Sequence, residues 1–344
     1  MHMADALLSP AVGGTMWAAT ATLIGYSTKK VQQTLDDSTT PLMGVLGAFI
    51  FAAQMINFTI PATGSSGHLG GGMILAILLG PPAAFLTMAS VLTIQSLFFA
   101  DGGLLALGCN IFNLGFFPCF LVYPLIYQKI AGNHPTRGRI VTGSVISAII
   151  GLQLGAFGVV LETMFSGISE LPFTQFVLLM QPIHLAIGVV EGLATAAVIM
   201  FIWQARPELL ERATPGAGVK RFAIKPVLVG LIAATILTAG ILSWFASAHP
   251  DGLEWAMFHT AGTEELETPE NSIYSSLATI QEKTAILPDY SFKKPETQTE
   301  EKSETWPAVD PGTSVSGLVG GAVVFLIAMG IGFGLKGKKS GAMS

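Results

Sequence analysis

Long apolar segments recur along the whole chain and decide what this sequence can fold into. Nine of them carry at most one charged side chain each: 11–27, 42–60, 69–80, 83–100, 104–128, 140–163, 181–203, 227–247 and 315–335. A helix needs about 20 apolar residues to span a bilayer, and lipid offers no hydrogen bonds to an unpaired backbone. Only 11% of the 344 residues are charged, against about 25% in a soluble globular chain. The pattern predicts an all-α, polytopic bundle of membrane helices.

The third segment, residues 69–80, is too short to cross a membrane unaided. It ends at Gly80-Pro81-Pro82, and proline interrupts a helix because it has no N–H to donate. Two interpretations remain open. Either this segment is a short helix buried by its neighbours, or residues 69–100 form one broken hairpin.

The basic residues predict the orientation of the chain, because cytoplasmic loops carry an excess of Lys and Arg. Thirteen of the 17 basic residues follow the first, fifth, seventh and last segments. They share one side only if 69–100 counts as two crossings, which gives nine crossings in total. We therefore expect the amino terminus outside, the carboxyl terminus in the cytoplasm, and residues 1, 2 and 68 on the outer face.

The segment 248–313 differs from the rest, with thirteen acidic and four basic residues and few apolar runs. One interpretation is a solvated, partly disordered spacer. The other is an acidic antechamber that concentrates cations near an entrance on the outer face.

The dipeptide Met1-His2 forms a ready metal chelator. The Met1 amine, the His2 backbone nitrogen and the His2 imidazole close two fused rings around one ion. A fourth nitrogen from another imidazole completes a square, which suits Ni(II) or Cu(II) and suits Zn(II) poorly. On these two residues alone, a histidine present by chance or left from a tag is the simpler interpretation.

His68 is the natural fourth ligand. It lies in a glycine-dense loop, 61–72, and glycine lets backbone approach a ligand closely. A single loop histidine is often structural, but His68 is expected on the same face as His2. The sequence thus predicts a metal site formed by Met1, His2 and His68.

Four polar residues around the fourth and fifth segments could orient these ligands by hydrogen bonding: Gln95, Asp101, Asn110 and Asn113. Asn110 and Asn113 are three residues apart and so share a helix face. The alternative is that such side chains only join helices inside the bilayer.

Gln181, His184 and Glu191 share one face of the seventh segment. His184 is therefore a further candidate for orienting the ligands. A buried hydrogen-bonded network without any role in metal binding explains the same stripe equally well.

Other chemistry finds little support in the sequence. There is no His-Glu-x-x-His pattern of a membrane metalloprotease, and residues 332–339 lack the Ser or Thr that ends a phosphate-binding loop. Cys109 and Cys119 lie in an apolar segment and are expected to be buried thiols. We expect no nucleotide site in this chain and no nucleic-acid partner.

The motifs together resemble a known family. The start Met1-His2 with Asp5–Pro10, the loop Ser66-Gly67-His68-Leu69-Gly70, and the block Gln95–Asn113 are similar to the nickel and cobalt M components (NikM, CbiM) of energy-coupling factor (ECF) transporters. The resemblance covers residues 1–225. The remainder, 226–344 with the stretch Ser247–Trp255, looks like a fused N component (NikN, CbiN), with 248–313 as its long extracytoplasmic loop.

The resemblance implies a seven-helix M domain in which the amino terminus enters the bundle and Met1, His2 and His68 bind the metal. It implies that this chain captures Ni(II) from outside and delivers it inward through the inner (plasma) membrane. The energy would come from ATP hydrolysis by separate ATPase subunits, linked through a membrane-embedded coupling T component, so the chain alone would not be an enzyme.

Three alternatives remain open. The first is cobalt uptake for cobalamin synthesis. The second is a membrane-embedded metalloenzyme that uses His2, His68 and His184 and keeps one metal position open for water. The third is a membrane interaction module without metal. Because all three proposed ligands precede residue 70, the sequence also predicts that metal affinity resides in residues 1–225 alone.

Overall fold

The structure is a computed structural model that describes residues 2–34, 39–133, 135–169, 171–207, 209–210, 224–269, 272–293 and 306–336. Its α-helices are α1 (Pro10–Thr34), α2 (Thr39–Gln54), α3 (Gly72–Leu79), α4 (Pro81–Phe99), α5 (Leu107–Ile111), α6 (Gln128–Ala131), α7 (Arg137–Ser166), α8 (Phe173–Ala205), α10 (Lys225–Gly240), α11 (Gly252–Ala261), α12 (Ser272–Thr284) and α13 (Pro311–Lys336). Short 3-10 turns are η1 (Asp5–Leu7), η3 (Leu242–Phe245) and η4 (Pro288–Tyr290), and η2 (Phe112–Tyr127) is a π-helix that joins α5 to α6.

The prediction of a polytopic helical membrane protein is confirmed. Within the described ranges, five helical segments are long and apolar enough to cross a membrane: α4, the run from α5 to α6, α7, α8 and α13. Two further apolar helices, α2 and α10, are 16 residues long. The 25 residues of α1 include buried Thr20 and Ser27, so this helix is long enough to span but less apolar.

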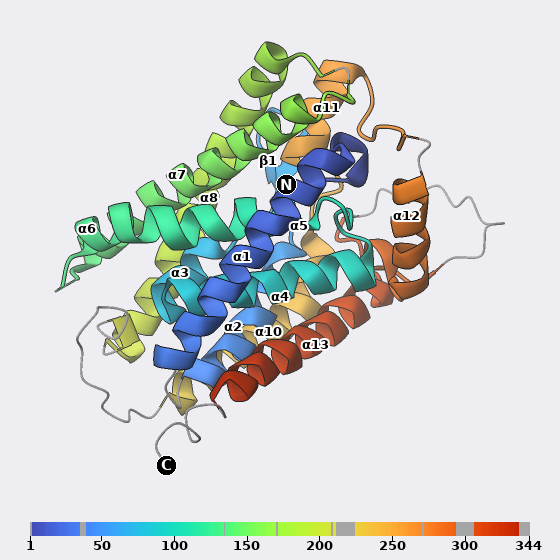
Figure 1. Cartoon of the computed structure of the whole chain (residues 1–344). Coiled ribbons are helices and arrows are strands. Elements are labelled where there is room, and N and C mark those ends of the chain that lie inside the picture. Colours follow the sequence, from blue (N-terminus) through green and yellow to red (C-terminus); the bar gives the residue numbers. More distant parts are fainter. Residues whose placement is uncertain are drawn as a thin grey trace.

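The two C-terminal helices belong to the same bundle as the rest (Figure 1). Helix α13 lies along α2, and α10 packs against both of them, while α7 and α8 form a second pair on the side of η2. The approach of α13 to α2 is close, because a Cβ at Gly320 would lie 2.1 Å from the ring of Phe51. A glycine at this position therefore lets the two helices meet.

Helix α3 decides between the two interpretations of residues 69–100. It has eight residues, seven of which are buried, and ends at Gly80 with a φ of 75° before Pro81 opens α4. It is thus a short helix buried by its neighbours. Its backbone hydrogen bonds close within the helix, and its side chains are enclosed by neighbouring elements rather than by lipid.

Two predicted spans end earlier than the hydropathy indicates. The segment 42–60 is helical only to Gln54, and Phe58–Ile60 then forms strand β1, which pairs antiparallel with β2 (Ser65–Gly67). The segment 227–247 is helical only to Gly240 and continues as η3. After Gln54 the apolar side chains of Met55 and Ile60 are buried in the protein, whereas Ile241, Leu242 and Phe245 after Gly240 are exposed. Hydropathy overestimates the length of the helix in both places.

The described part of the acidic segment 248–313 contains two helices and a turn, so the segment is not a solvated spacer over its whole length. Helices α11 and α12 and the turn η4 lie at the same end of the bundle as the start of α1 (Figure 1). The Tyr274 hydroxyl on α12 donates to the Leu8 carbonyl over 2.7 Å. Aromatic and amide side chains dock this segment despite its charge, which average composition does not reveal. Residues 294–305 lie outside the described part.

Candidate metal site

The hairpin of β1 and β2 carries His68 into the bundle. Thr59 pairs with Ser66, and Phe58 pairs with Gly67, so the returning strand β2 ends immediately before the histidine. A Cβ at Gly67 would lie 2.5 Å from the Ile187 side chain on α8. Glycine at this position therefore lets the hairpin approach α8, which places the His68 side chain in a buried position.

Asn110 fixes the chain beside His2. The Met3 N–H donates to Asn110 Oδ1 over 2.8 Å, and Asn110 Nδ2 donates to the Met3 carbonyl over 3.3 Å. The Gly103 N–H donates to the same carbonyl over 3.0 Å. Both backbone groups of Met3 are thus held from the block 101–110, which fixes the position of the preceding residue, His2.

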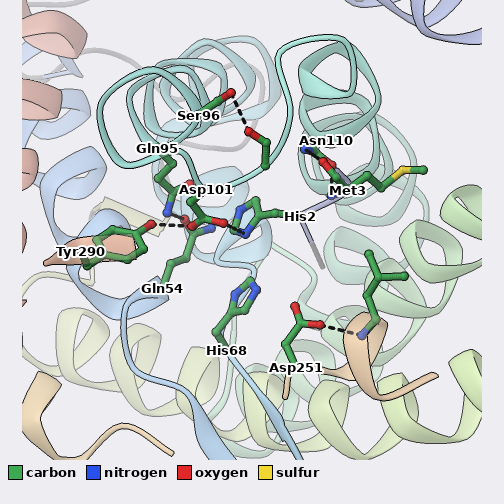
Figure 2. A network of polar contacts seen from close by, with 12 residues as sticks. His2, Met3, Gln54, His68, Gln95, Ser96, Asp101, Asn110, Asp251 and Tyr290 are labelled. Atoms are coloured by element: carbon green, nitrogen blue, oxygen red, sulfur yellow. Dashed lines mark hydrogen bonds and ion pairs between the residues drawn. The ribbon is translucent and has the colours of Figure 1, made fainter. Parts of the chain in front are cut away.

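The imidazoles of His2 and His68 lie face to face, as Figure 2 shows, with ring centroids 5.0 Å apart and planes 5° from parallel. Two imidazoles bound to adjacent corners of one metal have centroids about 4.5 Å apart, given metal–nitrogen bonds of about 2.0 Å. The centroid separation is thus close to what a shared metal requires, but the nitrogen lone pairs of two stacked rings lie in parallel planes, so one ring must turn before both bind the same ion. Met1 lies outside the described residues, so its predicted role stays a prediction.

Asp101 contacts the His2 ring directly. His2 Nδ1 lies 3.1 Å from Asp101 Oδ1, and the other oxygen of this carboxylate accepts the hydroxyl of Tyr290 (Figure 2). His2 Nε2 is buried and has no hydrogen-bond partner among the described residues. A chelate through the His2 backbone nitrogen needs Nδ1, so the ring must turn about its Cβ–Cγ bond when the metal binds.

Electrostatics keep His68 in the form that binds metals. Burial lowers the pKa of the His68 imidazole to about 3, so the ring is neutral at physiological pH. Its Nδ1 lies 3.2 Å from the Leu69 carbonyl, which assigns the proton to Nδ1 and the lone pair to Nε2. Burial opposes ionisation of Asp101, yet the adjacent His2 lowers the pKa of this carboxyl below its ordinary value.

Glu191 on α8 anchors the loop after His68. Its two carboxylate oxygens accept the N–H groups of Gly70 and Gly71, each over 3.0 Å. Gln54 Nε2 donates to the Gly70 carbonyl over 2.8 Å, and Gln95 Nε2 donates to Gln54 Oε1 over 2.8 Å. Gln95 therefore acts on the loop through Gln54, whereas the sequence predicts a direct role in orienting the ligands.

Asn113 and His184 make their hydrogen bonds to partners other than His2 and His68. Asn113 Nδ2 donates to Glu162 Oε2 over 2.8 Å, so this amide serves α7 although it shares a helix face with Asn110. His184 Nδ1 lies 2.8 Å from the Met180 carbonyl on its own helix. His184 nevertheless lines a small cavity together with His68 and Asp251.

Sequence reasoning did not assign Gln54, Asp251 or Tyr290 to this site. Asp251 caps α11 by accepting the N–H groups of Leu253 and Glu254, over 2.7 and 3.0 Å. No three His, Cys, Asp or Glu side chains in the described part converge on one point that could hold a metal. Backbone or terminal nitrogens must therefore supply further ligands if His2 and His68 hold an ion.

Comparison with known families divides the chain into two regions. Residues 2–209 match the model of the CbiM family, described as the cobalt uptake substrate-specific transmembrane region. The chain belongs to the CbiM family. Residues 225–337 match a second model, the PDGLE domain, so the chain joins a CbiM region to a PDGLE region.

Similar proteins match either nearly the whole chain or mainly its CbiM region. A putative fused nickel transport protein NikMN from Archaeoglobus fulgidus is 32% identical over 345 residues, covering 97% of this chain and 98% of that protein. The cobalt transport protein CbiM from Geobacter sulfurreducens is 28% identical and covers 70% of this chain and 72% of that protein. A crystal structure of a transition metal transporter, 29% identical, covers 62% of this chain and 97% of that one with a TM-score of 0.53.

Proposed function

We propose that this chain is the membrane subunit that captures Ni(II) and passes it inward. The observation that carries the proposal is the buried pair of imidazoles, His2 and His68, with ring centroids 5.0 Å apart. The metal is the cargo of this site rather than a resident cofactor.

The proposed ligand set is four nitrogens in a plane: the Met1 amine, the His2 backbone nitrogen, the His2 imidazole and the His68 imidazole. Such a set suits Ni(II) better than Co(II). Membership of the CbiM family and the A. fulgidus relative named as a nickel transport protein support transport of one of these two ions. The G. sulfurreducens relative, named as a cobalt transport protein, keeps Co(II) as the second candidate.

The energy in this proposal comes from separate chains: a coupling T component in the membrane and cytoplasmic ATPase subunits. The site would open to the outer face, with the carboxyl end of α13 in the cytoplasm next to Lys336. Residues 1–225 would hold the metal, and residues 226–344 would form the N-like part.

An unblocked amino terminus provides the sharpest test. Full-length protein with a free Met1 amine should bind Ni(II), and N-terminal acetylation or one added residue should weaken binding more than about 100-fold, because it removes one nitrogen and disrupts the chelate that Met1 and His2 share. Isothermal titration in detergent measures both forms, and a C-terminally tagged form is the control. Equal affinities would exclude Met1 as a ligand.

Uptake by cells tests the energy source. Cells that supply the coupling and ATPase chains should accumulate Ni(II), and cells with a catalytically inactive ATPase should not, while binding by the purified subunit remains. Uptake that persists without ATP hydrolysis would refute the coupling. A higher affinity for Co(II) than for Ni(II) would favour the second candidate, and turnover of a substrate at a water-bound metal would favour an enzyme.

A further inference from the structure

Tyr290 connects the PDGLE region to the metal site through a single carboxylate. Its hydroxyl donates to Asp101 Oδ2 over 2.5 Å, while Asp101 Oδ1 lies 3.1 Å from His2 Nδ1 (Figure 2). The two contacts use different oxygens and so do not compete. A residue 288 positions after His2 thus lies two contacts from its ring.

Aromatic neighbours hold Tyr290 in place. Its ring stacks on Phe99 with centroids 4.9 Å apart and planes 16° from parallel, and it meets Phe51 edge-on at 6.2 Å. The Leu287 N–H donates to the Phe98 carbonyl over 3.2 Å. Tyr290 has a φ of 57°, a left-handed conformation that residues with a Cβ seldom adopt, so tertiary contacts hold it there.

The helix before Tyr290 fixes the backbone around Asp101 as well. Gln281 Nε2 on α12 donates to the Ser96 carbonyl over 2.9 Å and to the Gly102 carbonyl over 2.8 Å. The Ser96 hydroxyl also donates to the Gly102 carbonyl, over 2.9 Å. The segment 281–290 therefore controls both the loop that carries Asp101 and the direction of its carboxylate.

We propose that Tyr290 is a positioning residue of the metal site, whose hydroxyl orients the Asp101 carboxylate that contacts the His2 imidazole. A carboxylate that accepts the N–H of a ligating histidine fixes its tautomer and its ring angle, and loss of such a partner commonly weakens metal binding. In this proposal, when the His2 ring turns to present Nδ1 to the metal, the contact with Asp101 passes from Nδ1 to Nε2–H. The inference rests on the proposed function.

A positioning role for Tyr290 changes which parts of the chain are expected to determine metal affinity. The sequence places all metal affinity in residues 1–225, because every proposed ligand precedes residue 70. With Tyr290 acting through Asp101, the PDGLE region contributes to affinity without supplying a ligand.

The test compares two tyrosine-to-phenylalanine variants in the full-length protein. Tyr290→Phe removes the hydroxyl on Asp101 and keeps the stacked ring. Tyr274→Phe removes a hydroxyl from the same region that donates to the Leu8 carbonyl, so it reports on docking alone. Two measurements are made on each: Ni(II) affinity by titration, and the imidazole nitrogen shifts of His2 in metal-free protein labelled with 15N-histidine.

We expect Tyr290→Phe to weaken Ni(II) binding about tenfold and to shift the His2 ring signals, with Tyr274→Phe within about twofold of the parent protein. Equal losses in both variants would overturn the proposal, because the hydroxyls would then only dock the segment. An unchanged His2 spectrum and affinity in Tyr290→Phe would also overturn it.

The two readouts separate this inference from the proposed function. If the parent protein binds no Ni(II) but Tyr290→Phe still shifts the His2 signals, the proposed function fails and the link from Tyr290 to His2 stands. If the parent binds Ni(II) and Tyr290→Phe matches it in both measurements, the proposed function stands and the positioning role of Tyr290 fails.

Discussion

The Glu191 carboxylate on α8 accepts the backbone N–H of Gly70, two residues after His68, over 3.0 Å. Its second oxygen accepts the N–H of Gly71, so one buried side chain satisfies two successive amides. A Cβ at Gly70 would lie 3.1 Å from this carboxylate. The pairing explains why the loop needs glycine here and fixes the distance between His68 and α8.

Glu191→Gln should therefore loosen the His68 loop. The glutamine amide keeps one acceptor and turns an N–H₂ group toward a donor, so we expect Ni(II) affinity to fall about tenfold and the free energy of unfolding to fall by about 2 kcal/mol. Titration and thermal unfolding in detergent measure the two effects. Glu282→Gln on the exposed face of α12 is the matched control, and an equal loss in both would remove Glu191 from the site.

Replacing His2, His68 or His184 by alanine should weaken Ni(II) binding to different extents, according to the role proposed for each residue. His2→Ala removes part of the chelate and should abolish measurable binding. His68→Ala leaves three nitrogens, so we expect weakened binding, about 10- to 100-fold. His184→Ala should stay within about threefold, since its Nδ1 is engaged by the Met180 carbonyl. Loss of binding in His184→Ala with a silent His68→Ala would show that the ligand assignment is wrong.

Two asparagines on the same helical stretch should behave differently. Asn110→Ala removes both hydrogen bonds to Met3 and should lower Ni(II) affinity about tenfold, because His2 is then free to move. Asn113→Ala breaks only the contact with Glu162 and should lower thermal stability with little change in affinity. Affinity and melting temperature measured on both variants check this; the opposite pattern would reverse their assigned roles.

The depressed pKa of His68 predicts an unusual pH response. Its pKa is about 3 in the folded protein, against about 6.5 in an unfolded chain. Between these values the unfolded state binds the extra proton, so stability falls as pH drops from about 6.5 toward 3 and this loss is absent above 6.5. The His68 nitrogen signals of metal-free protein should not titrate between pH 5 and 8. A titration of His68 near pH 6.5 would contradict its burial.

Hydropathy predicted the membrane helices well because burial in lipid leaves a long, uniform signature. It failed where apolar residues pack against protein, as after Gln54, where three-residue strands leave no periodic pattern. Composition also misjudged the acidic segment, since a few side chains such as Tyr274 and Gln281 decide its docking.

The candidate site was predictable where side chains carry the chemistry. The approach of His2 to His68 follows from the nitrogens that a chelate needs, and the structure places the rings 5.0 Å apart. The anchoring role of Glu191 was not predictable, because its partners are backbone amides, which no residue type identifies. Tyr290 was missed because only the fold brings it to Asp101.

The hairpin that carries His68 also contacts the PDGLE region. The N–H of Ser66 in β2 donates to the Pro250 carbonyl over 2.7 Å, beside the capped start of α11. The strand that delivers His68 is thus flanked by both regions of one polypeptide. Covalent linkage keeps the effective concentration of one flank for the other high, in the millimolar range for short linkers, whatever the amount of protein made. The two halves therefore assemble one to one in every molecule, and dilution in the membrane cannot separate them.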